Sequence, residues 1–405
     1  MNNKEILLDV IGDTSPELIP DISPKKKKRR AIKWAAAGVG ICAAAVIACI
    51  AIFPGGEKSS VNISPYSGLP QISGSKKAGS EKISSEITFG AMGYEALMVY
   101  DISELDTPNP WSEDSGITEL PVFRNLAYTG NEGGRTALYL TEEQMTGIAE
   151  NTASSLNTDI TQTEIVYLRD FMMNVPERFY DGVYSVEAEC SDKTKITVYG
   201  GGKIRIDFDG RSLPGEYSFT YSETSGEEAE ATLKYLTEEY SSVLAFGEPA
   251  CYSYADRSYF GEESRSYYVY DASGDTVQDI LNYNLSNAQF CPDDYGNLMC
   301  IWLDNAFCSA EYLGDYPIIS SDDAKALLLA DSYISTVPDE YINGGSIAED
   351  DIAKSELVYR TYNAEYYQPY YKFYVELDAS GFEIDDGLHD YGIFYVPAVE
   401  AEYRD

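Results

Sequence analysis

Histidine is almost absent from this chain, whose 405 residues include only His389. One residue cannot supply a metal site with two histidine ligands. A hydrolytic triad would have to use His389 itself, which stands among acidic residues in an expected loop. The sequence also lacks a G-x-S-x-G nucleophile elbow and a phosphate-binding loop. We therefore expect no catalytic residues, no metal site, no cofactor and no enzyme activity.

Basic residues are scarce beyond residue 33. Five of the 67 acidic and eight of the 29 basic residues lie in residues 1–33, which leaves the remainder with a net charge of −41. So acidic a surface is repelled by nucleic acid and by anionic lipid headgroups. Nucleic acid is therefore excluded as a partner.

The chain has a single long apolar run without charged residues, at residues 34–53. A helix of this length rises roughly 30 Å, which matches the hydrocarbon core of a bilayer. Six basic residues precede the run: Lys25, Lys26, Lys27, Lys28, Arg29 and Arg30. Because short basic flanks stay inside, we expect a cytoplasmic segment at residues 1–30, a single transmembrane helix at residues 31–54, and an extracytoplasmic remainder in the cell envelope.

Two alternatives to a retained helix stay open. Residues 46–49 resemble a bacterial lipobox, so Cys49 could carry a lipid anchor, or the run could be a cleaved signal peptide. The polar region in front of the run is long for a signal peptide, and apolar residues 50–53 continue past the cysteine. We therefore favour the helix.

The cytoplasmic segment has one short amphipathic stretch. On two helical turns Ile6, Leu7, Val10 and Ile11 lie on the same side, and Gly12 follows as a stop. So short a helix is marginal alone, and its apolar face needs a partner. That partner is either a cytoplasmic regulatory protein or the membrane surface.

Residues 4–13, the basic cluster and the apolar run together resemble the amino terminus of clostridial single-pass membrane proteins, which are commonly anti-sigma-factor-like. The resemblance covers residues 1–55 and implies signalling from the envelope to the cytoplasm. One departure concerns zinc. A zinc-binding anti-sigma domain needs His and Cys ligands, and residues 1–30 contain neither.

Residues 55–85 are rich in Gly, Ser, Pro and Lys and predict a flexible linker. Beyond the linker, helical periodicity followed by strand patterns recurs. We therefore expect an α+β fold of tandem external modules at residues 86–215, 216–312 and 313–405, each with a helix and an antiparallel sheet. The many aromatic and β-branched residues favour half-buried antiparallel strands.

Three helices are expected in these modules. The first opens at a capping box formed by Thr141 and Gln144. The second has the clearest periodicity of the chain, from Ala229 to Leu244. The third starts near Ser320 and continues through Ile334. Strands are expected at residues 195–199, 203–208, 280–290, 298–303, 357–362, 371–377 and 393–399, the first two joined by a glycine turn.

The last module resembles a PepSY-type domain and is similar to the external domains of regulators attached to Gram-positive sensor kinases. The residues that carry the resemblance are 316–320, 324–329, 356–359, 369–376 and 395–399. The resemblance implies a binding or inhibitory domain with no shared catalytic residues.

Two kinds of segment leave alternatives open. Tyr370, Tyr371 and Tyr374 belong to a tyrosine-rich stretch that could stack against a sugar, although half of such residues line the core in an alternating strand. Two Asp/Gly segments, residues 271–275 and 293–297, carry oxygen ligands for calcium but lack EF-hand spacing, and a solvated turn is the commoner explanation.

Five cysteines lie beyond the apolar run, so any disulfide scheme leaves one unpaired: Cys190, Cys251, Cys291, Cys300 and Cys308. Cys291 and Cys300 flank an expected hairpin turn and could pair across it if their α-carbons come within about 7 Å. Cysteine is also a good small core residue, and we favour free thiols.

These observations leave two functions from different classes. In the first, the protein is a bitopic regulator whose acidic external region binds a ligand or partner and signals to a cytoplasmic partner, such as a sigma factor or a kinase system. In the second, it is a membrane-anchored envelope-binding protein without signalling.

Overall fold

The computed structural model describes residues 94–128, 139–171, 181–342, 345–361, 364–378 and 384–404. The fold is mixed α+β, and every strand pair within these ranges is antiparallel, as the sequence predicts. Among the described residues, no helix is both long and apolar enough to cross a membrane. The predicted transmembrane helix at residues 31–54, the basic cluster and the apolar face of residues 6–11 lie outside the described residues.

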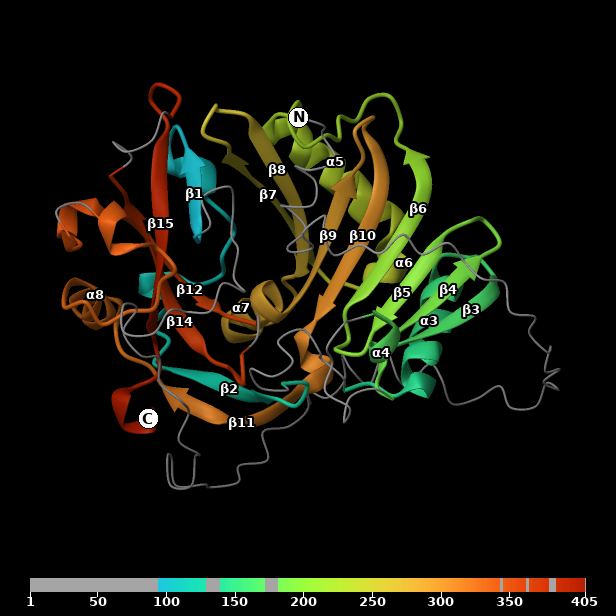
Figure 1. Cartoon of the computed structure of the whole chain (residues 1–405), viewed down its shortest axis with the longest axis horizontal. Coiled ribbons are helices and arrows are strands. Elements are labelled where there is room, and N and C mark those ends of the chain that lie inside the picture. Colours follow the sequence, from blue (N-terminus) through green and yellow to red (C-terminus); the bar gives the residue numbers. More distant parts are fainter. Residues whose placement is uncertain are drawn as a thin grey trace.

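An eight-stranded sheet fills one side of the molecule (Figure 1). Its strands are β3 (Ile160–Tyr167), β4 (Val183–Cys190), β5 (Lys195–Tyr199), β6 (Ile204–Ser212), β10 (Asn297–Asn305), β9 (Ser286–Pro292), β8 (Glu263–Asp271) and β7 (Pro249–Arg257), in that spatial order. β3 to β6 and β7 to β10 are two consecutive meanders, joined where β6 pairs with β10. The sheet therefore runs across the boundary expected between residues 215 and 216.

One helix precedes each meander and packs against the sheet. α3 (Glu142–Ser155) begins at the predicted capping box, in which Thr141 and Gln144 each bind the other's backbone. α5 (Gly226–Glu239) begins at a second box formed by Ser225 and Glu228 and continues into α6 (Ser241–Leu244). Their buried residues share core clusters with strands of the sheet, which confirms both predicted helices. A one-turn helix, α4 (Leu168–Phe171), follows β3.

The second part of the molecule is built on two smaller sheets. β1 (Ala96–Val99), β15 (His389–Pro397), β14 (Pro369–Glu376) and β12 (Ile352–Tyr359) form a four-stranded sheet, and α8 (Ser321–Leu329) packs against it. β11 (Ala310–Pro317), β2 (Glu119–Asn125) and β13 (Tyr366–Tyr367) form a three-stranded sheet. β1 and β2 therefore pair with strands that lie at least 185 residues further along the chain, as Asn125 and Ala310 do.

Short 3₁₀ helices connect these elements: η2 (Ile102–Leu105), η3 (Glu113–Ser115), η5 (Ala306–Ser309), η6 (Asp339–Tyr341), η8 (Glu349–Asp351) and η10 (Ala401–Tyr403).

The strand predicted at residues 280–290 is wrong in its first half. Residues Thr276–Leu285 form a helix, α7, and only then does β9 begin. Asp275 caps α7 by accepting a hydrogen bond from the Gln278 backbone at 3.0 Å. Ile280, Leu281 and Leu285 are buried in the largest core cluster, together with residues of β12 and β14. α7 thus lies between the two large sheets and connects their cores.

The third predicted helix is shorter than expected. α8 is capped by Ser320, close to the predicted start, but it ends at Leu329, not beyond Ile334. Asp331 adopts a left-handed backbone conformation with φ of 58°, and the Ser332 N–H donates back to the Leu327 carbonyl at 2.9 Å, so the chain leaves the helix there. Ile334 instead makes an isolated bridge to Tyr395 of β15.

Candidate functional site

A cleft of about 370 Å³ lies beside β7, the outermost strand of the eight-stranded sheet. The residues that line it come from three elements: η2 and the chain after it, the first turns of α5, and strands β7 and β8. They are Ser103, Glu104, Asp106, Gly226, Glu230, Cys251, Tyr252, Ser253, Ala255 and Arg265.

The edge of β7 that faces the cleft is open. Backbone hydrogen bonds join Glu248 to Ala272 at one end of the β7–β8 pair and Ser258 to Glu262 at the other end. The register between these two bonds is unbroken. Because hydrogen-bonded pairs alternate along antiparallel strands, the even-numbered residues of β7 bond to β8. The odd-numbered residues Cys251, Ser253 and Ala255 therefore direct their N–H and C=O groups away from β8, on the side of the cleft. Within the described ranges these backbone groups make no hydrogen bond.

Charged side chains around the cleft are held by partners. Glu104 accepts hydrogen bonds from the Tyr100 and Asp101 backbones, each at 3.0 Å, and forms an ion pair with Arg257. Arg265 binds Glu263 at 2.7 Å and donates to the Ser253 hydroxyl at 3.3 Å. These contacts hold both walls of the cleft in fixed positions.

A buried polar network stands behind the cleft. Lys354 donates to the Leu105 carbonyl at 2.7 Å and contacts Asp106 at 3.1 Å, which ties the η2 wall to β12. The same ammonium lies 2.9 Å from Glu356, whose other carboxylate oxygen accepts from the Tyr374 hydroxyl at 2.9 Å. Lys372 in turn donates to the Tyr374 hydroxyl at 2.8 Å. The network thus joins the cleft wall to the middle of the four-stranded sheet.

Stacked tyrosines adjoin this network. The rings of Tyr252 and Tyr268 lie 5.3 Å apart at an interplanar angle of 17°, and those of Tyr254 and Tyr268 lie 5.9 Å apart at 4°. Tyr283 of α7 stacks on Tyr252 at 5.2 Å and donates to Thr107 at 2.9 Å. Tyr252 also lines the cleft, where it is the one aromatic residue among the lining residues.

The tyrosine-rich stretch around residue 370 divides between two faces. Tyr371 packs in the core against α8 and donates to the Ile319 carbonyl at 2.8 Å. Tyr370 and Tyr374 lie in a separate core cluster with Tyr395 and are buried. The alternation that the sequence suggested is therefore observed, and none of these three rings forms an exposed platform.

Two carboxyl groups, the buried Asp390 and the half-buried Asp256, lie where β7, β1 and β15 meet. Asp256 accepts hydrogen bonds from the Met98 and Arg257 backbones at 2.9 and 2.8 Å. Asp390 accepts from the Tyr94 hydroxyl at 2.8 Å, and its second oxygen has no hydrogen-bond partner in the described part of the chain. Burial is the main cause that raises the pKa of each group to about 6. For Asp390 the hydrogen bond from Tyr94 opposes this shift and the Asp256 charge contributes to it.

The cleft supplies binding groups and one thiol. Burial raises the pKa of Cys251, whose sulfur lies 3.4 Å from the Thr237 hydroxyl, so the thiol is protonated at neutral pH. The arrangement can hold a ligand by backbone hydrogen bonds and by contact with Tyr252.

His389 is not in a loop, contrary to the expectation. It is the first residue of β15, and its Nδ1 lies 2.7 Å from Glu376 on the neighbouring strand. The two Asp/Gly segments form turns closed by their own side chains. Asp271 accepts from the Ser273 backbone, and Asp293 accepts from the backbones of Tyr295 and Asn297. Within the described residues no group of three or more potential metal ligands occurs.

The predicted partner face of Ile6, Leu7, Val10 and Ile11 and the basic cluster lie outside the described residues. Sequence reasoning missed the cleft, because its residues come from segments as far apart as Ser103 and Arg265. The alternating tyrosines of β7 were the only local signal of a half-buried strand at this place. No protein family model, no curated protein and no solved structure matches this chain.

Proposed function

We propose that the described part of the chain is an extracytoplasmic binding module that takes an extended peptide along the open edge of β7. The observation that carries this proposal is the row of outward backbone groups at Cys251, Ser253 and Ala255 inside a cleft. An added strand would satisfy these groups with its own N–H and C=O, which is how sheet edges recognise peptides.

The charges at the rim favour a basic peptide. Glu230 is exposed and forms no ion pair within the described residues, whereas Glu104 and Asp106 on the opposite wall are paired with Arg257 and Lys354. Arg265 is the only cation among the lining residues, and it is bound to Glu263. Lysine or arginine side chains of a bound strand would therefore meet a negative potential, which also speeds encounter with the strongly acidic surface.

The module belongs, in this proposal, to a bitopic membrane regulator. A transmembrane helix at residues 31–54 would place it outside, and the short inner segment would contact a sigma factor or a kinase system. A helix before each of the two meanders, α3 before β3 to β6 and α5 before β7 to β10, supports the proposed PepSY-like repeat, although the two meanders share one sheet and α7 lies between β8 and β9. The alternative is an anchored envelope-binding protein without signalling.

Replacement of Ser253 by proline should weaken peptide capture strongly and leave the fold intact. Its N–H points away from β8, so proline removes an outward donor and no bond of the sheet. Losing a hydrogen bond of about 1.4 kcal/mol weakens binding about tenfold. A photo-reactive residue at Glu230, activated in intact cells, measures the yield of cross-linked partner in each background.

Ser253→Ala is the matched control, because it removes the hydroxyl and keeps the N–H. The cross-linked yield should stay near the wild-type level in Ser253→Ala and fall in Ser253→Pro. If both variants retain full yield while circular dichroism shows them folded, the ligand does not use the edge of β7.

Exchange of residues 1–30 for an unrelated sequence with the same six basic residues should separate regulation from anchoring. A regulator loses its effect on transcription, whereas cross-linking at Glu230 persists because the external module is unchanged. Transcript profiles of the exchanged strain and of a deletion strain provide the measurement. Transcripts identical to those of the wild type would favour the anchored envelope-binding protein.

A further inference from the structure

Two of the described cysteines face each other across neighbouring strands. Cys291 of β9 and Cys300 of β10 are direct partners in the antiparallel register. Both are free thiols, and both are buried, with 4% and 0% of their surfaces exposed. The pair closes the hairpin whose turn is held by Asp293.

The distance between the two backbones fits a disulfide. Even-numbered residues of β8 bond to β7, so its odd-numbered residues bond to the even-numbered residues of β9. The odd-numbered residues of β9, which include Cys291, therefore direct their backbone groups toward β10. Cys291 and Cys300 thus form a hydrogen-bonded pair. The register of β10 shifts between Leu298 and Cys300, so Cys300 is the first residue that pairs with β9 after this irregularity. In regular hydrogen-bonded pairs the α-carbons lie about 5.5 Å apart, which falls inside the range of about 4.4 to 6.8 Å for disulfides. Side chains of opposite residues also project from the same face of the sheet.

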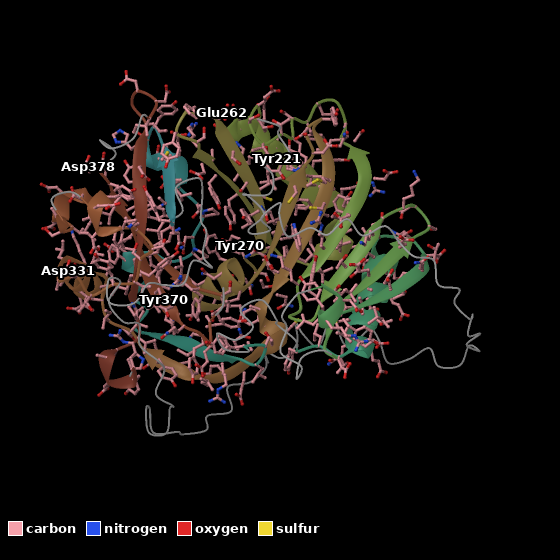
Figure 2. The ribbon with its side chains drawn as sticks, in the orientation of Figure 1. Tyr221, Glu262, Tyr270, Asp331, Tyr370 and Asp378 are labelled. Carbon is pink, nitrogen blue, oxygen red and sulfur yellow. The ribbon has the colours of Figure 1, made fainter. Side chains whose placement is uncertain are left out.

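The surroundings make the two thiols unequal. The hydrogen bond from Cys300 lowers the pKa of Cys291, burial opposes this shift, and Arg205 and Tyr221 lower the pKa further. The same bond, together with burial, raises the pKa of Cys300. Figure 2 shows the labelled Tyr221 close to sulfur atoms in the part of the sheet that contains β9 and β10. Cys291 is therefore the better nucleophile of the two.

We propose that Cys291 and Cys300 are a thiol oxidation site that forms a reversible disulfide with a small-molecule disulfide as oxidant. The Cys291 thiolate attacks one sulfur of the oxidant and releases one thiolate, which leaves a mixed disulfide on Cys291. Cys300 then loses its proton and attacks the Cys291 sulfur, and the second half of the oxidant leaves as a thiol. Two protein thiols are oxidised, and one small disulfide is reduced to two thiols.

The other described cysteines provide internal controls. Cys190 lies in the core under α3, and Cys251 contacts Thr237 beside the cleft. Neither is a register partner of another cysteine in the described sheets. The inference is independent of the peptide site, because oxidation can occur whether or not β7 binds a strand.

The test uses the full chain, folded, exposed to oxidised glutathione and then alkylated under denaturing conditions. We expect peptide mapping to recover one cross-linked peptide pair containing Cys291 and Cys300, with Cys190, Cys251 and Cys308 alkylated. Dithiothreitol should return both thiols. The variant Cys300→Ser should instead retain glutathione on Cys291, and Cys251→Ser should behave as the wild type.

Two results would overturn the inference. One is full alkylation of Cys291 and Cys300 in a folded sample under conditions that oxidise the same chain in urea. The other is a disulfide that joins either residue to a different cysteine while the circular dichroism spectrum stays native. Because the first measurement is made on the unmodified chain, failure of a variant to fold does not affect it.

Discussion

Replacing Asp390 by asparagine is expected to raise the free energy of unfolding at pH 7 by up to about 3 kcal/mol. The pKa of this carboxyl group is raised from 3.8 to about 6, mainly by burial, and a tenfold change in an ionisation constant corresponds to about 1.4 kcal/mol. Asparagine keeps an acceptor for the Tyr94 hydroxyl and removes the buried charge. The free energy of unfolding rises because the folded variant no longer has to bury an ionised carboxylate away from water.

The sign of the pH dependence follows from the direction in which the pKa moves. A carboxyl group whose pKa is higher in the folded chain than in the unfolded chain favours folding when it is protonated. Its contribution is complete below pH 3.8, decreases as the pH rises, and is lost above about pH 6. The stability difference between Asp390→Asn and the wild type should thus grow from near zero at pH 3.8 to its full size above pH 6.

Urea denaturation at several pH values between 4 and 8 provides the measurement. The groups that face Asp390 are Tyr94, Tyr259 and the Asp256 carboxyl, and Asp256→Asn should show the same pH trend because its pKa is also raised to about 6. Asp294, an exposed carboxylate in the β9–β10 turn, is the matched control. If Asp390→Asn and Asp294→Asn change the free energy of unfolding equally at every pH, the charge of Asp390 does not destabilise the folded chain.

Truncation of Glu356 to alanine is expected to lower the free energy of unfolding by about 3 kcal/mol, because removing one partner leaves a buried charge uncompensated. Glu356 is 6% exposed and is bound by Lys354 at 2.9 Å and by the Tyr374 hydroxyl at 2.9 Å. Without it, Lys354 loses its buried carboxylate partner and keeps its contacts to the Leu105 carbonyl, to the largely exposed Asp106 and to the Tyr374 ring. Glu356→Gln keeps the shape and an acceptor, so its loss should be smaller.

Lys193→Ala is the control for this experiment. Its ammonium pairs with Asp209 at 2.7 Å, but both side chains are largely exposed, so the variant should show no measurable loss. Thermal and urea unfolding of the three variants at pH 7 measure the difference. A loss in Glu356→Ala no larger than in Lys193→Ala would mean that the network behind the cleft contributes nothing to stability.

Local signals were sufficient where a few neighbouring residues determine the structure. The capping box at Thr141 acts over three residues, and α3 begins there as predicted, while α5 forms where the apolar periodicity from Ala229 indicates a helix. The glycine turn after Tyr199 likewise joins β5 and β6 as predicted. The sequence did not predict α7, because its short apolar pattern is also compatible with a strand. In the structure the segment is a helix, and its apolar residues pack in the core with residues of β12.

The amino-acid sequence by itself determined the α+β class, the acidic character beyond residue 33, the presence of α3, α5 and α8, and the starts of α3 and α8, because composition, charge and capping act over a few residues. Only the tertiary structure decided the order of the strands. Pairing of β6 with β10 and of β1 with β15 joins distant segments, and no local pattern specifies which edges meet. That order leaves β7 at the edge of its sheet, and the cleft exists for this physical reason.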